Sequence, residues 1–379
     1  MHKTLIPFSK PYTTSHELEY LTQVLGSDHL SGDGPFTQKC HSWLENHTNS
    51  QKALLTHSCT AALEMAAMLI GIRAGDEIIM PSYTFVSTAN AFVLRGGIPV
   101  FVDIRPDTQN INEALIEVAI TPKTRAIVPV HYAGVACDMD IIMDIAKRHD
   151  LFVIEDAAQA IGGQYKGRTL GSIGHLGCYS FHQTKNIQCG EGGALLINDD
   201  QFVVRSEILR EKGTNRKQFV AGQVDKYTWV DIGSSYLMSD ILAACLYSQL
   251  LDISEIQEQR KMIWNAYFGG LKEWALTNGV QLPYVPENCD QGFHMFYLIL
   301  PTTEARSNFI LHLNGKGISA VFHYLPLHAS PMGKRFDTNN NRCPVTCETS
   351  DRLVRLPFFQ DLTPDELSFV ISIVTQYQI

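Results

Sequence analysis

The chain has 379 residues, of which 45% are hydrophobic and 18% are charged, and its formal net charge is −9. This length and composition are typical of a globular protein with two domains. The negative charge argues against nucleic acid as a partner, because binding a phosphate backbone requires a basic face. A small phosphorylated ligand is compatible with it, since a few hydrogen-bond donors can hold one phosphate group.

Nine cysteines are scattered along the chain, mostly in apolar runs, which favours free thiols in a reducing compartment. Cys343 and Cys347 form one close pair, but no second pair or histidine cluster accompanies them, so we expect no metal site. Residues 1–12 lack the apolar core of a signal peptide, and no stretch reaches the roughly 18 apolar residues of a membrane helix. We therefore expect a cytoplasmic protein without membrane insertion.

Short apolar runs alternate with helical patterns between about residues 50 and 200. The runs that predict strands are 76–83, 98–104, 125–132, 151–158 and 193–199, and the segments that predict helices are 58–71 and 139–150. The runs are apolar on both faces, as in strands covered by helices on two sides. The alternation predicts βαβ units in a mostly parallel sheet, whose ligands bind at the carboxyl ends of the strands.

The pattern changes in the C-terminal third of the chain. Residues 234–264 predict one long helix, and 294–300 and 320–329 predict strands of a smaller α+β domain. A capping box with proline at the first helical position, Thr363-Pro364-Asp365-Glu366, predicts the start of the last helix. The predicted boundary gives a large α/β domain over 1–250 and a small α+β domain over 251–379.

Three charged residues stand near apolar, strand-like runs, in places where a charge needs an explanation. Glu155 and Asp156 end an apolar strand, where an unpaired buried carboxylate is costly. Asp156 either caps a following helix or pairs with a buried ligand cation such as a protonated pyridine nitrogen. Lys185 comes about one strand–connection–strand unit later, so both can reach the same sheet edge. A lone lysine is usually a solvated surface residue, whereas a desolvated one can form a Schiff base.

A phosphate pocket is predicted from a turn rich in serine and threonine that leads into an alanine-rich helix. Unpaired amides and hydroxyls at Ser58, Thr60 and Ala61 would make an anion site, although Ser58 could simply cap its own helix. Ser180, on the strand before the lysine, would complete the pocket. Phe85 follows another strand at the ligand edge, where it either stacks on a planar ring or packs in the core.

These segments together resemble the DegT/DnrJ/EryC1/StrS sugar aminotransferases, which have the aspartate aminotransferase-like fold type I. The resemblance covers nearly the whole chain and is carried by SCTAALEMAA, PSYTFVSTANAF, VPVHYAGVACDMD, EDAAQA, SFHQTKN, GEGGALLIND, REKGTNR and DIGSSYLMSD. It implies an α/β protein whose large domain binds pyridoxal 5'-phosphate (PLP) on a mostly parallel central sheet flanked by helices. Within the family, the chain is most similar to transaminases that form dTDP-4-amino-4,6-dideoxygalactose for surface polysaccharides of the enterobacterial common antigen or O-antigen type.

The resemblance also implies roles for individual residues. Lys185 would be the Schiff-base lysine and proton shuttle, and Asp156 would pair with the pyridinium nitrogen. The residues expected to bind the cofactor are Thr60, Ala61 and Ser180 at the phosphate, Phe85 and Gln159 at the ring, and Asp156, Lys185 and Ser235. Those expected to line the sugar-nucleotide pocket are Thr84, His131, Tyr132, His323 and His328. Ser235 stands where many relatives carry an asparagine that reaches the phosphate of the neighbouring subunit's cofactor.

The implied reaction has two halves that share one site. L-glutamate would pass its amino group to the cofactor, which would then aminate carbon 4 of dTDP-4-keto-6-deoxy-D-glucose in a homodimer with active sites between the subunits. Two alternatives are an enzyme that gives the gluco epimer and one that acts on a 3-keto sugar. Related sugar dehydratases carry histidine in place of the lysine, so Lys185 argues against them. A non-enzymatic regulator that binds a sugar nucleotide or PLP is the alternative from another class.

Overall fold

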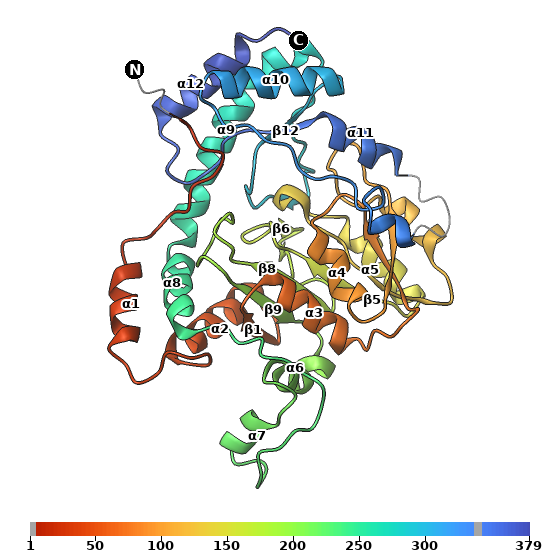
Figure 1. The fold of residues 1–379 in the computed structure, drawn as a ribbon, viewed down its shortest axis with the longest axis vertical. Helices are drawn as coiled ribbons and strands as arrows, with labels where there is room; N and C mark the ends of the chain where they lie inside the picture. The colour runs from red at the N-terminus through yellow and green to blue at the C-terminus, as the bar shows by residue number, and fades with distance from the viewer. Residues whose placement is uncertain (1–4, 337–342) are drawn as a thin grey trace.

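A seven-stranded sheet forms the centre of the fold in a computed structural model that describes residues 5–336 and 343–379 (Figure 1). Its strands in spatial order are β1 (Lys52–Thr56), β9 (Gly193–Ile197), β8 (Leu176–Ser180), β5 (Phe152–Asp156), β4 (Thr124–Ile127), β2 (Glu77–Pro81) and β3 (Ile98–Val102). β9 runs antiparallel to both of its neighbours, and the pairs from β8 to β3 are parallel. The predicted α/β class with a mostly parallel sheet is confirmed.

Helices cover both faces of this sheet. One face is covered by α3 (Cys59–Leu69), α4 (Val86–Val93) and α6 (Val203–Arg210), and the other by α2 (Pro35–Thr48), α5 (Met139–Arg148) and α8 (Asp240–Leu251), with α1 (Glu17–Leu25) packed on α8. In β2, Ile78 and Met80 pack in the core beneath α3, whereas Ile79 packs in the opposite core. Successive strand residues point to opposite faces, which explains why the strand sequences are apolar throughout.

The C-terminal part of the chain builds a second, smaller core. It contains α9 (Ile253–Asn278), α10 (Thr303–Gly315), α11 (Pro344–Arg352), α12 (Pro364–Thr375) and the antiparallel pair of β11 (Tyr297–Ile299) and β12 (Leu353–Arg355). Its buried residues include Trp264, Phe296 and Phe309, and the N-terminal Ile6 packs among them. The first residues of the chain therefore lie with the C-terminal part. We propose the break between α8 and α9 as the domain boundary.

Short elements complete the described structure. They are α7 (Arg216–Val220), the three-stranded sheet of β10 (Cys289–Asp290), β6 (Gln164–Tyr165) and β7 (Arg168–Thr169), and 3-10 turns at Glu113–Leu115, Glu117–Ala119, Tyr132–Gly134, Asp200–Phe202 and Gly333–Phe336. No helix within 5–336 or 343–379 has both the length and the apolar character needed to cross a membrane.

The prediction of one long helix over 234–264 is wrong at its start and in its middle. The Ser239 hydroxyl accepts a hydrogen bond from the backbone of Leu242 and so begins α8, and the chain breaks at Asp252 before α9 starts. A serine cap and a one-residue break leave the apolar pattern almost unchanged, so the periodicity did not reveal them. At α12 the capping box between Thr363 and Glu366 is present as predicted.

The predicted strand over 320–329 is also wrong. Val321 pairs with Arg355 in one isolated bridge, and the residues after it run without strand partners. The segment contains several aromatic residues, and its His323 and Tyr324 line a cavity and have no strand partners. The β11–β12 pair already supplies the sheet of the smaller core.

Candidate active site

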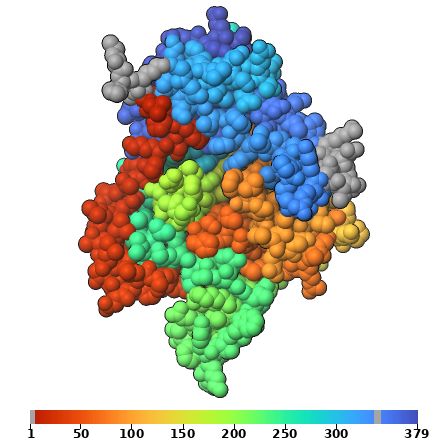
Figure 2. Space-filling model, in the orientation of Figure 1, coloured from red at the N-terminus to blue at the C-terminus, as the bar shows by residue number. Residues whose placement is uncertain are grey.

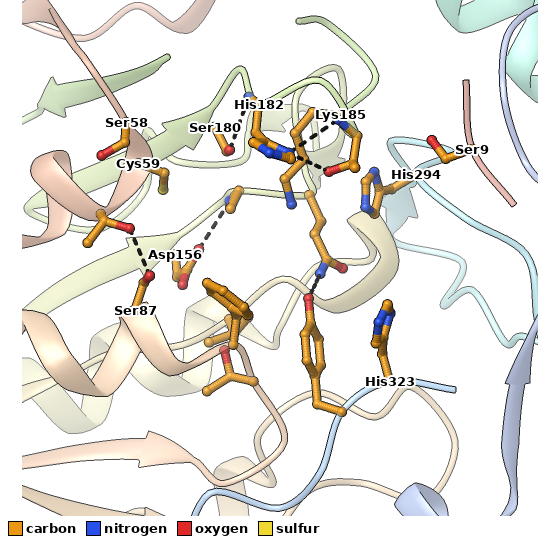
Figure 3. Close-up of a pocket in the computed structure, with 18 of the residues that line it drawn as sticks. Ser9, Ser58, Cys59, Ser87, Asp156, Ser180, His182, Lys185, His294 and His323 are labelled. Atoms are coloured by element: carbon orange, nitrogen blue, oxygen red, sulfur yellow. Dashed lines mark hydrogen bonds between the residues drawn. The ribbon is translucent and has the colours of Figure 1, made fainter. Parts of the chain in front are cut away.

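A cavity of about 450 Å³ opens at the carboxyl ends of the parallel strands (Figure 3). Its walls come from the start of α3, the β2–α4 connection, the end of β5, the β8–β9 connection and the smaller core. In the close-up, Ser58 and Cys59 lie on one side, and His294 and His323 lie on the other. The position at the strand ends is the one expected for ligands of parallel sheets.

Lys185 lies in the connection between β8 and β9, where the surrounding backbone is tightly held. Its amide donates to the carbonyl oxygen of His182 at 2.8 Å. Gly190 has φ +83, a conformation that favours glycine, and so allows the return turn. A Cβ atom on Gly193 would lie 2.4 Å from the backbone nitrogen of Cys59, so β9 can begin beside α3 because this residue is glycine. The glycines thus bring the lysine connection against the start of α3.

The amino group of Lys185 is desolvated in this setting. Burial lowers its pKa from the ordinary 10.5 to about 8, with the nearby Arg355 charge acting in the same direction and Asp156 opposing it. An amine with this pKa is partly unprotonated near neutral pH, so it can act as a nucleophile and as a proton carrier. The interpretation of Lys185 as a solvated surface residue is therefore not supported.

Asp156 ends β5 and faces the same cavity. Its Oδ2 accepts a hydrogen bond from Thr88 Oγ1 at 2.7 Å, and Thr88 Oγ1 is also 2.8 Å from Thr84 Oγ1. Its Oδ1 accepts from the backbone nitrogen of Ala158 at 3.2 Å. A turn follows β5, not a helix, so the helix-cap alternative for Asp156 does not hold. The two hydrogen bonds fix a buried carboxylate that is available to a cationic ligand.

The neighbouring carboxylate of Glu155 has a different role. It is fully buried and accepts three backbone hydrogen bonds from the loop 171–174 at 2.6 to 2.8 Å. His131 Nε2 lies 2.8 Å from Glu155 Oε2, and the amide of Cys137 donates to His131 Nδ1 at 3.2 Å. Because both ring nitrogens have partners and His131 is 0% exposed, this histidine is structural. The structure does not bring it to the cavity, contrary to the expectation from sequence.

Two further predicted pocket residues lie outside the lining of the cavity. Tyr132 is buried, with its ring 5.2 Å from Tyr83 and 5.8 Å from Tyr297. His328 Nδ1 is 2.6 Å from Ser82 Oγ, and His328 is not among the residues that line the cavity. The structure therefore brings neither side chain to the cavity surface.

Small polar groups gather where α3 begins. The residues on this side of the cavity are Ser58, Cys59, Thr60, Ser87 and Ser180. Ser58 Oγ accepts from the amide of Ala61 at 3.1 Å, so the self-capping alternative holds for these two residues. The amides of Cys59 and Thr60 have no partner within the helix, as expected in a first turn. Together with the hydroxyls, they form a site suited to a phosphate.

The predicted ring-binding residues also line the cavity. Phe85 is 57% exposed and its ring lies 6.2 Å from that of Tyr324. Gln159 is held at both ends of its amide, because Oε1 accepts from the backbone of Ala133 at 2.7 Å and Nε2 donates to Tyr324 Oη at 3.1 Å. An exposed aromatic ring and a fixed amide in the same cavity are suited to a planar ligand.

The smaller core contributes residues that the sequence did not indicate, among them His294 and Arg355. His294 Nδ1 is 2.9 Å from Oδ1 of Asn186, the residue after Lys185. Burial and nearby positive charges hold the pKa of His294 well below its usual value, so its ring is neutral. A usable signal for Arg355 was its position as a lone charge in the apolar run LVRLPFF.

Comparisons with known proteins identify the family. A profile of the DegT/DnrJ/EryC1/StrS aminotransferase family matches residues 11–375. The chain belongs to this family. It is 33% identical over 377 residues to the spore coat polysaccharide biosynthesis protein SpsC of Bacillus subtilis, covering 97% of this chain and 96% of SpsC. It is also 33% identical to the uncharacterized protein MJ1066 of Methanocaldococcus jannaschii, covering 99% and 98% of the two chains.

Among solved structures, the PLP form of the putative sugar aminotransferase Spr1654 from Streptococcus pneumoniae matches with a TM-score of 0.90. The two proteins are 27% identical, and the match covers 98% of each chain. This aminotransferase uses PLP as its cofactor. The groups present in the cavity fit this cofactor: amides without helical partners at the start of α3, the anchored carboxylate of Asp156 and the desolvated amine of Lys185.

We expect the aminotransferase without cofactor to attach PLP to Lys185 with a rate that rises with pH and levels off above about 8. At pH 7 about one tenth of an amine with this pKa is unprotonated, compared with less than about one thousandth of an ordinary lysine. Stopped-flow absorbance over pH 6 to 11 measures the rate, and a lysine peptide in the same buffers gives the ordinary profile. A rate that still rises above pH 10 would contradict the lowered pKa.

Proposed function

We propose that this aminotransferase transfers the amino group of L-glutamate to carbon 4 of dTDP-4-keto-6-deoxy-D-glucose, giving dTDP-4-amino-4,6-dideoxy-D-galactose and 2-oxoglutarate. The observation that carries the amino-transfer chemistry is the desolvated Lys185 in the same cavity as the anchored Asp156. The printed names of SpsC and Spr1654, a polysaccharide biosynthesis protein and a putative sugar aminotransferase, support a sugar acceptor. The nucleotide, carbon 4 and the galacto configuration rest on the resemblance of the sequence.

In this proposal each residue of the chain has a defined task. PLP supplies an electron-withdrawing ring when it is bound. Asp156, held by Thr88 and the backbone of Ala158, keeps the nitrogen of that ring cationic. Lys185 Nζ carries a proton between substrate atoms, because its pKa of about 8 is close to neutral pH. Both substrates use the same cavity in turn, which predicts ping-pong kinetics.

Incubation with dTDP-4-keto-6-deoxyglucose and L-glutamate, followed by NMR of the purified product, tests the proposal. An axial amine at carbon 4 gives small couplings of H4 to both neighbouring protons and supports the galacto product. Large couplings would indicate the gluco epimer. If lysine-bound PLP is present but this sugar gives no amine, the enzyme acts on another keto sugar, such as a 3-keto sugar. Formation of no amine, together with no absorbance of lysine-bound PLP, would favour the binding-protein alternative.

The proposal includes a homodimer, supported by an exposed apolar protrusion. The segment around α7 extends away from the body of the molecule (Figures 1 and 2). Its exposed apolar residues are Phe219, Val220, Tyr227, Trp229, Val230 and Ile232. Contiguous exposed apolar surface is typical of protein–protein contacts. Ser235 is exposed near the base of this segment and outside the cavity of its own chain, which is compatible with a contact to the neighbouring subunit's cofactor.

We expect Trp229→Asp to weaken this dimer. Trp229 is 77% exposed, and truncation of a tryptophan at the centre of an interface typically costs at least about 2 kcal/mol, or roughly 30-fold in Kd. Light scattering over a range of protein concentrations measures the change. Leu311→Asp on α10, where Leu311 is 69% exposed, is the matched control and should leave the dimer intact. If both substitutions weaken the dimer equally, or if neither weakens it, the protrusion is not part of the interface.

A further inference from the structure

His294, in the segment before β11, is held in place at the cavity wall. Arg260 on α9 donates from Nε to the carbonyl oxygen of Phe293 at 2.9 Å and from Nη2 to the carbonyl oxygen of His294 at 2.7 Å. These two bonds fix the backbone of the segment, and His294 itself is 5% exposed. Its side chain therefore lines the cavity from a fixed backbone.

A chain of hydrogen bonds decides which ring nitrogen of His294 carries the proton. Gln257 Nε2 donates to the carbonyl oxygen of Ile161 at 2.7 Å, so Oε1 is the end of this amide that faces Asn186. Asn186 Nδ2 donates to that Oε1 at 3.3 Å and also to the carbonyl oxygen of Gly292. Asn186 Oδ1 is thus the atom 2.9 Å from His294 Nδ1, and because an amide oxygen only accepts, Nδ1 must be protonated.

The other ring nitrogen of His294 is left as an acceptor. A neutral imidazole has one donor and one acceptor nitrogen, and burial with nearby positive charges keeps this ring neutral by holding its pKa well below the usual value. Nε2 has no hydrogen-bond partner among the residues that the structure describes, and it is not one of their fully buried atoms without a partner. It therefore faces open space, and the space that His294 lines is the cavity (Figure 3).

A fixed acceptor distinguishes between the two substrates of the proposed reaction. Glutamate carries carboxylates, which cannot donate a hydrogen bond to a lone pair, and an amine that must stay free to react. A keto sugar carries ring hydroxyls, each of which can donate. A site with a placed partner for a hydroxyl also rejects ligands that lack it, because its polar group is then left unpaired. The chemistry of Nε2 therefore favours the sugar.

We propose that His294 Nε2 accepts a hydrogen bond from a ring hydroxyl of the keto sugar and so helps the cavity to select a sugar as the amino acceptor. This inference rests on the proposed amino transfer to a sugar. Asn186 and Gln257 are positioning residues, because they hold the ring in the tautomer that leaves Nε2 unprotonated. Asn186 directly follows Lys185 in the chain, so one residue joins the lysine connection to the sugar site.

Two substitutions of His294 separate the roles of its ring nitrogens, because asparagine places a polar atom near the position of Nδ1 and glutamine near that of Nε2. We expect His294→Asn to lower kcat/KM for conversion of the aminated enzyme by the keto sugar by about 3-fold to 10-fold, as for a lost neutral hydrogen bond. The glutamate half-reaction should change less than about 2-fold. His294→Gln keeps an acceptor in the cavity and should retain more of the sugar half-reaction. His312→Asn on α10 is the matched control, because His312 contacts Tyr377 outside the cavity, and it should change neither half.

Deoxy analogues test the same contact in the unaltered enzyme. The 2-deoxy and 3-deoxy forms of the keto sugar each lack one hydroxyl, and one of them should react more slowly with the wild-type enzyme by at least a similar factor. With that analogue, His294→Asn should cause no further loss, because the hydroxyl and its acceptor belong to the same contact.

Two readouts do not depend on turnover. Nitrogen NMR of the PLP-loaded enzyme, labelled at its histidine rings, should show a protonated Nδ1 and an unprotonated Nε2 for His294, assigned by the signals that disappear in His294→Asn. Calorimetry with dTDP-glucose, which keeps ring hydroxyls but has no keto group, should show weaker binding to His294→Asn by a similar factor and unchanged binding to His312→Asn. The unfolding temperature reports folding of each variant.

Three outcomes would overturn the inference. A protonated Nε2 would mean that His294 offers no acceptor to the cavity. Equal losses in the two half-reactions would assign His294 to a step that both substrates share, and no loss in either would show that it binds no hydroxyl. Failure of the proposed function has a different signature, because a wild-type enzyme that does not aminate this sugar would still show by NMR whether Nε2 is unprotonated and by calorimetry whether dTDP-glucose requires His294.

Discussion

Replacing Lys185 by alanine is expected to lower the rate of amino transfer by at least about 10³-fold, the upper part of the range for loss of a positioned acid–base group. Lys185 is the lysine that lines the described cavity, and the lowered pKa of its amine suits both attachment of PLP and proton transfer. The near-visible absorbance of lysine-bound PLP should be lost at the same time. Single-turnover kinetics and an absorbance spectrum measure the two effects.

Two controls separate chemistry from folding in this variant. Lys166→Ala removes an exposed lysine that pairs with Asp140, and it should leave both the rate and the spectrum unchanged. A small primary amine such as ethylamine should restore part of the rate to Lys185→Ala, because it can enter the vacated space and carry the proton. Full activity of Lys185→Ala, or equal losses in both variants, would contradict the assignment.

The sheet and the residues at its edge were predictable because they depend on local pattern. Strands that are apolar throughout indicate cover on both faces, and the carboxyl ends of parallel strands meet at one edge. Asp156 and Lys185 therefore came together as predicted. The pairing of β9 against β8 was not predictable in the same way, because strand direction is decided by connections and packing across the whole domain.

The wall formed by the smaller core could not be derived from spacing. Arg355 lies far along the chain from Lys185, and its approach depends on how the two cores pack. The histidines were equally ambiguous, because His131 and His323 both follow apolar runs. The ring of His131 contacts the buried Glu155, whereas His323 lines the cavity. Only tertiary neighbours decide whether such a side chain is structural or binds ligand.

Asp156 and Glu155 are adjacent carboxylates of β5, and we expect one to affect catalysis and the other to affect folding stability. Asp156→Asn should still bind PLP, because the phosphate site and Lys185 remain, but amino transfer should fall by at least about 100-fold. The neutral amide cannot hold the ring nitrogen in its cationic form. A PLP analogue methylated on the ring nitrogen, which is permanently cationic, should restore part of the rate. Loss of packing alone would not be corrected by that analogue.

Glu155→Gln is the matched variant, because it makes the same chemical change one residue earlier on the opposite face of the strand. Glu155 accepts from three backbone amides and faces His131, so the substitution should destabilise folding by about 3 kcal/mol through lost charged hydrogen bonds. The folded fraction should keep its kcat. Thermal unfolding and kinetics at low temperature test both variants, and a larger catalytic loss in Glu155→Gln than in Asp156→Asn would reverse the two assignments. Because neighbouring strand residues face opposite sides, one carboxylate can serve the ligand while the other holds the loop behind it.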